Sequence, residues 1–193
     1  AGGRVVLPGL WDMHVHATAQ DGLLHVANGV TGARDLGNDH EVVMGLARDF
    51  GSGELIGPRL QRAGFIDKKS PYTAPTGTPV ETLEQALAQI DDYAGKGYQQ
   101  VKIYSSIPPE WVAPMAERMH GHGMRLSGHI PAFMTAEEAV RAGFDEIQHI
   151  NMLFLNFVAE PDTDTRTPAR FIKVAEEAGK LDLDSDEVRA FIA

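Results

Sequence analysis

Two histidines near the start of the chain are its most informative residues for chemistry. His14 and His16 close an apolar run, residues 5–16, that is typical of a buried strand. Residues two apart on a strand point to the same face, so both imidazoles would converge at the C-terminal end of that strand. Neutral imidazole is a common metal ligand, and the pair would supply half of a site. Two ordinary polar residues at a strand edge are the alternative, so further ligands must come from elsewhere.

Three more candidate ligands lie on or just after predicted strands. Lys102 and Tyr104 share one face of a short β-prone run, whereas His129 and His149 each end a strand-like run of their own. A buried polar side chain with a structural role explains any one of these residues at least as well as function does. That explanation is much poorer for four histidines and one lysine at the ends of four predicted strands.

The composition excludes several classes of chemistry. The 193 residues are 43% hydrophobic and 23% charged, which is ordinary for a globular domain. A net charge of −10 argues against nucleic acid or an anionic membrane surface as a partner. The absence of cysteine rules out disulfides, thiolate catalysis and cysteine-bound zinc, and it leaves both the cytoplasm and the periplasm open. No apolar run approaches the ~18 residues of a transmembrane helix.

The pattern of elements is strands alternating with helices. The predicted strands are residues 5–16, 30–35, 58–66, 99–104, 124–129 and 144–149. Helices are expected over 21–28, 40–50, 79–94, 109–121, 136–142 and 169–178, with a last one capped by Ser185; Thr78 and Thr135 would open capping boxes. Six such units imply a parallel sheet with right-handed crossovers, either open or closed into a barrel. Candidate ligands at strand C-termini favour the barrel.

These motifs together resemble the amidohydrolase superfamily, and within it the branch of imidazolonepropionase and Xaa-Pro or Xaa-Arg dipeptidase-like enzymes. The resemblance extends over about residues 1–150, and it lies in the following segments: residues 6–16, 28–31, 34–37, 101–104, 128–129 and 148–149. It implies an α/β fold with an incomplete (β/α) TIM-type barrel over residues 9–193. Residues 1–8 would then be a remnant strand of a small flanking β-sandwich domain.

The resemblance also implies a binuclear metal site, usually zinc. His14 and His16 would bind the more buried ion, His129 and His149 the more exposed one, and Lys102 would bridge both in its N-carboxylated form. Elementary chemistry agrees, because burial favours the neutral lysine amine, which can capture carbon dioxide as an anionic carbamate. The activity implied is hydrolysis of amide, peptide or cyclic amide C–N bonds through a metal-bridging hydroxide. The substrate would be a small or dipeptide-like molecule.

One catalytic group of the family has no counterpart in this sequence. The family places an aspartate at the end of its eighth barrel strand, and none of the late acidic residues here follows a predicted strand. We therefore expect a fragment that lacks the last two barrel strands, contains no catalytic residue of its own, is inactive alone and self-associates through an exposed edge. Asp35 and Tyr104 are candidates for orienting a ligand imidazole or contacting substrate.

Two other functions fit the same residues. The segment could be a catalytically inactive metal-binding or oligomerising module. It could equally belong to a non-hydrolytic barrel enzyme, such as a metal-dependent isomerase or decarboxylase, because the ligands alone do not define the reaction.

Overall fold

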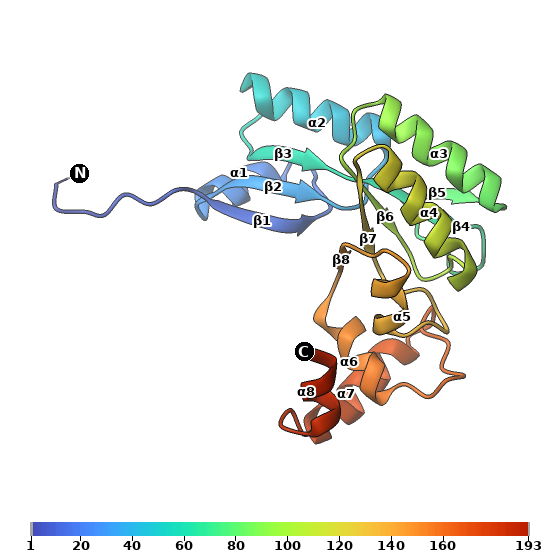
Figure 1. Cartoon of the computed structure of the whole chain (residues 1–193). Coiled ribbons are helices and arrows are strands. Elements are labelled where there is room, and N and C mark those ends of the chain that lie inside the picture. Colours follow the sequence, from blue (N-terminus) through green and yellow to red (C-terminus); the bar gives the residue numbers. More distant parts are fainter. Residues whose placement is uncertain (1, 193) are drawn as a thin grey trace. The chain divides into compact units, whose positions relative to one another are not determined.

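The computed structural model of the chain describes residues 2–192, in which strands and helices alternate except for three successive strands over residues 59–80 and successive helices after residue 150 (Figure 1). The chain divides into two compact units, Ala1–Phe65 and Ile66–Ala193, which we describe separately. Among the described residues, no helix has both the length and the apolar character needed to cross a membrane.

The first unit is a parallel three-stranded sheet with two helices. Its strands β1 (Leu10–Val15), β2 (Val30–Asp35) and β3 (Arg59–Arg62) pair in the order β1-β2-β3. The helices α1 (Asp21–Ala27) and α2 (His40–Ser52) follow β1 and β2. A small core of Val15, Ala33, Val43, Leu46, Phe50 and Leu60 packs α2 against the sheet.

The first strand is shorter and more exposed than its apolar sequence predicts. β1 begins at Leu10, and residues 4–9 adopt no regular secondary structure. Val5, Val6 and Leu7 are 84%, 81% and 77% exposed, so the prediction of one buried strand over residues 5–16 is wrong for its first part. The assignment of residues 1–8 to a flanking domain stays a prediction, and Ala1 lies outside the described residues.

The second unit contains a five-stranded sheet in the order β5-β4-β6-β7-β8. The strands are β4 (Gly64–Lys68, which begins at the boundary), β5 (Thr78–Val80), β6 (Gln100–Ile103), β7 (Arg125–Gly128) and β8 (Glu146–Ile147). Pairing is parallel between β4 and β5, between β6 and β7, and between β7 and β8. The helices are α3 (Leu83–Gly95), α4 (Pro109–Gly121), α5 (Ala136–Arg141), α6 (Ile150–Val158), α7 (Ala169–Glu177) and α8 (Asp186–Ile192), with a 3₁₀ turn over Ala178–Lys180.

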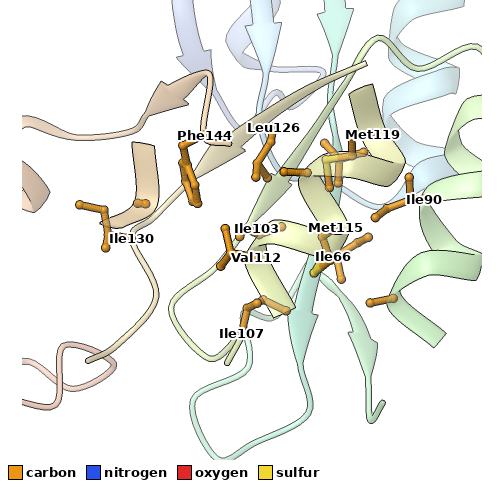
Figure 2. Packing of buried hydrophobic residues seen from close by; sticks show 14 of the residues in the cluster. Ile66, Ile90, Ile103, Ile107, Val112, Met115, Met119, Leu126, Ile130 and Phe144 are labelled. Atoms are coloured by element: carbon orange, nitrogen blue, oxygen red, sulfur yellow. The ribbon is translucent and has the colours of Figure 1, made fainter. Parts of the chain in front are cut away.

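Apolar side chains from strands and helices form the core of this unit. Ile66, Ile103 and Leu126 point from the strands, and Ile90 and Met115 come from α3 and α4 (Figure 2). All five side chains are completely buried. The core therefore fixes the strands whose C-terminal ends carry Lys102 and His129.

Helix starts were predicted with mixed success. Thr135 forms the expected capping box with Glu138 at α5. At α3 the prediction is wrong, because Thr78 and Pro79 belong to β5 and the cap is Thr82, whose hydroxyl accepts from the Gln85 amide. Helix α6 was not predicted. The α/β class with parallel strands is confirmed.

Candidate functional site

In the first unit, His14 and His16 lie at the C-terminal end of β1, as predicted. Their ring centroids are 5.3 Å apart, with an angle of 68° between the ring planes. The two side chains therefore lie beside one another, which is the local arrangement that a shared metal site requires. His14 is half-buried and His16 is exposed, so a ligand can reach the pair.

The orientation of His16 is set by the turn after β2. Its Nδ1 atom lies 2.8 Å from the Gly37 carbonyl oxygen. A carbonyl only accepts, so Nδ1 carries the proton in this contact and Nε2 keeps its lone pair for a metal. Gly37 has room for the ring only because it lacks a side chain, since a Cβ there would lie 3.0 Å from His16 Cε1.

Asp35, a predicted positioning residue, organises this turn. Its buried carboxylate accepts hydrogen bonds from the Ala17 and Gly37 amides, at 2.7 and 3.0 Å, and from the Asn38 side chain at 3.0 Å. Asp35 therefore acts on His16 through the backbone of Gly37.

In the second unit, Lys102 is the largest completely buried side chain, with an exposed fraction of 1%. It lies on β6 opposite Ser127 of β7, and all four residues of β6 are buried. Its Nζ atom is 5.8 Å from the centroid of the Tyr104 ring. Burying a charged ammonium at such a position costs free energy unless the charge is compensated.

His129 and His149 come together at the ends of β7 and β8. Their ring centroids are 4.8 Å apart and nearly perpendicular, and the Tyr104 ring packs 4.0 Å from the His129 ring. His129 is 5% exposed, whereas His149 is exposed. The Tyr104 ring therefore packs against His129, a predicted ligand, and its centroid lies 5.8 Å from Lys102 Nζ.

His149 has an unusual backbone conformation. Its φ of 67° lies in the left-handed region, which residues with a side chain seldom occupy. It is also the N-cap residue of α6, and Gln148 separates it from the short β8. Such strain costs about 1–3 kcal/mol and is concentrated at functional sites, which supports a functional role for this residue.

The predicted ligands therefore form two local groups. His14 and His16 belong to the first unit, and Lys102, His129 and His149 to the second. Over residues 2–192, no cluster of three or more histidine, cysteine or acidic side chains is arranged to hold a metal.

Sequence reasoning missed one buried acid, Asp67. It is fully buried on β4 and accepts hydrogen bonds from the amides of Lys68, Ala74 and Ser106 at 3.0, 3.0 and 3.2 Å. Burial raises the pKa of Asp67 to about 6, although these amides lower it. An acid within the apolar run Phe65-Ile66-Asp67 was the sequence signal available.

Histidines outside the two groups contact carboxylates. His120 lies 3.0 Å from Asp145, and His122 lies 2.7 Å from Asp91. Although these two histidines repeat the spacing of His14 and His16, each faces a different acid on the protein surface.

The comparisons with known proteins agree with the motifs. No protein-family model matches the chain. An enamidase from Eubacterium barkeri is 29% identical over 176 residues, covering 78% of this chain and 44% of the enamidase. A crystal structure of a Xaa-Pro dipeptidase with methionine bound in its active site has a TM-score of 0.60 at 22% identity, covering 76% of this chain and 48% of the dipeptidase. A bottromycin amidohydrolase has a TM-score of 0.70 at 22% identity, covering 88% of this chain and 37% of that protein.

These similarities confirm the resemblance to the amidohydrolase superfamily, with the solved structures establishing the fold. The relatives are hydrolases. The chain spans less than half the length of each of these three proteins.

Proposed function

We propose that the chain is the metal-binding part of a hydrolase that cleaves amide, peptide or cyclic amide C–N bonds. The observation that carries the proposal is the placement of five residues on or immediately after parallel strands. His14 and His16 lie at the end of β1, Lys102 on β6, and His129 and His149 follow β7 and β8. Converging side chains at strand C-termini are how barrel enzymes build their active sites, so we also propose a partial (β/α) barrel.

Divalent ions such as zinc would be held by His14 and His16 in the first unit and by carboxylated Lys102, His129 and His149 in the second. Each histidine pair has its rings within 5.3 Å of one another, which suits shared coordination. Two such ions, when bound, would activate a water and polarise the carbonyl of the substrate.

The chain's own residues contribute binding and orientation. The Gly37 carbonyl holds His16 in the tautomer whose Nε2 is a ligand. Tyr104 packs against His129 and restricts the rotation of that ring. The complete reaction also requires a proton donor for the leaving nitrogen, and none of the residues described here is assigned to that step.

The proposal is tested by the metal content of the purified protein. After growth with zinc and bicarbonate and thorough desalting, we expect close to two ions per chain by mass spectrometry. Lys102→Ala should lower this content, and in the intact enzyme it should lower hydrolysis of a dipeptide and cyclic amide panel by at least about 100-fold. Short carboxylic acids such as acetate should restore part of both.

Lys180→Ala is the matched control, because Lys180 is exposed and pairs with Glu177 at 2.9 Å on the surface. A folded wild-type protein without metal would contradict the metal site. Full activity of Lys102→Ala without added acid would contradict the bridging role.

A further inference from the structure

A cavity of about 410 Å³ lies within the second unit, beside the segment that follows His129. Its walls come from the loop between β7 and α5, from α6, and from residues 159–165. The walls combine apolar side chains, among them Ile130, Met134, Met152 and Leu155, with several polar ones. This volume lies within the usual range for small-molecule sites.

Several polar groups of the wall are already engaged within the protein. The Asn156 side-chain oxygen accepts from the Ala136 amide at 3.0 Å, and Glu138 is bound in the capping box with Thr135. In contrast, the buried hydroxyl oxygen of Thr165 has no hydrogen-bond partner among the residues that the structure describes. Leaving a buried hydroxyl unpaired is costly, so its partner is expected to be a water or a ligand in the cavity.

The cavity wall is connected to the candidate metal ligands. The Thr165 carbonyl accepts from Arg170 Nη1 at 3.3 Å, and Arg170 Nη2 lies 3.4 Å from the Tyr104 hydroxyl. The Tyr104 ring in turn packs on His129, and Ile130 follows His129 directly in the chain. A molecule in the cavity would therefore lie near the residues proposed to bind metal.

We propose that this cavity binds an aliphatic or thioether side chain of the substrate, next to the amide that is cleaved. The Thr165 hydroxyl donates a hydrogen bond to a carbonyl oxygen of the same molecule. The identity of the bound molecule as a substrate rests on the hydrolase function proposed above, whereas binding in the cavity does not.

The test uses methionine methyl groups as reporters in the purified protein. Met134 and Met152 line the cavity, whereas Met13 and Met44 belong to the first unit. We would label all methionine methyls with ¹³C and titrate with N-acetyl-L-leucine methylamide or N-acetylglycine methylamide. These probes differ only in the side chain.

The leucine probe should shift the Met134 and Met152 signals and bind at least about tenfold more tightly than the glycine probe. Ala159→Phe, which fills the cavity, should abolish the difference between the probes. Ala88→Phe, on an exposed position of α3, should preserve it. Thr165→Val should weaken binding of the leucine probe about fivefold or more, while Thr165→Ser retains it.

Equal affinity for the two probes, or unchanged binding in Ala159→Phe, would overturn the inference. If Ala159→Phe does not fold, Thr165→Val takes its place: unchanged binding of the leucine probe in Thr165→Val would also overturn the inference. Methyl shifts in this chain, together with an intact enzyme that hydrolyses no amide, would refute the proposed function and leave the cavity assignment intact. Hydrolysis of amides without these methyl shifts would refute the cavity assignment and leave the proposed function intact.

Discussion

At the scale of single residues, the candidate site depends on side chains that hold ligands in place. His16 illustrates this, because its ring is fixed by a carbonyl and by the absence of a side chain at Gly37. Asp35 in turn fixes Gly37 through its amide. Partners of this kind commonly change metal affinity by about 10–100-fold when they are altered.

We therefore expect Gly37→Ala to weaken metal binding without unfolding the protein. The new methyl group would lie 2.9 Å from Phe65 Cδ1 and 3.0 Å from His16 Cε1, so the imidazole must move. The expected loss of zinc affinity is about 10-fold or more, measured by competition with a chromophoric chelator.

Gly45→Ala is the control, since a Cβ at this position of α2 meets nothing within 4 Å. It should leave zinc affinity unchanged and stabilise the helix by about 0.5–1 kcal/mol. Equal zinc affinity in both variants would show that the orientation of His16 does not matter for binding.

The sequence predicted residues with a recognisable spacing better than residues that depend on long-range packing. His14, His16, Lys102, His129 and His149 were identified from strand periodicity and a family resemblance, and each lies on or next to the predicted type of element. Thr165 belongs to no pattern of that kind. Its role at a cavity wall arises from α6, an element that the sequence reading did not include.

At the scale of elements, the loop between β4 and β5 is held by one buried carboxylate. Asp67 bonds the Ala74 amide within this loop and the Ser106 amide after β6. The Ser70 hydroxyl adds a bond of 3.0 Å to that of Ser106. The loop is therefore tied to the segment that follows Lys102, and its order depends on a group that titrates near pH 6.

This titration predicts an unusual dependence of stability on pH. Because the folded-state pKa of Asp67 is raised from 3.8 to about 6, the folded chain keeps a proton that the unfolded chain has released between these values. The contribution of Asp67 to the free energy of unfolding therefore falls as pH rises through this window, by up to about 3 kcal/mol.

The measurement is urea denaturation of the wild-type protein and Asp67→Asn at pH values from 4 to 7. Other carboxylates are common to both proteins and cancel in the difference. The wild-type advantage should decrease steadily as the pH rises. A difference that is constant with pH would mean that Asp67 titrates normally in the fold.

Elements with strong local signals were predictable, and those defined by tertiary pairing were not. Val30–Asp35 forms a strand over the predicted residues, and the Thr135 capping box starts α5 as expected. In contrast, Thr78–Val80 pairs in register with β4, which no local pattern indicates. Helix α6 was missed because its sequence, INMLFLNFV, is apolar at seven of nine positions, and a short apolar run does not distinguish a helix from a buried strand.

At the scale of the whole molecule, the first unit has an unusually apolar edge. β1 lies at the edge of the three-stranded sheet, and Leu10 and Met13 on it are 61% and 51% exposed. The preceding residues Val5, Val6 and Leu7 are also exposed. Exposed edge strands with apolar side chains pair readily with other chains, and charged residues on such edges normally prevent this.

We predict that the protein self-associates through this edge and that one charge weakens the association. The wild-type mass from light scattering should rise above 21.0 kDa with concentration, since pairing buries the apolar side chains of two copies. Val6→Lys should remain near 21.0 kDa over the same range, because burying its ammonium costs more than the pairing gains. Val42→Lys, at an exposed position of α2, should associate like the wild type. A wild-type protein that stays monomeric at high concentration would show that residues 5–13 remain solvated despite their apolar character.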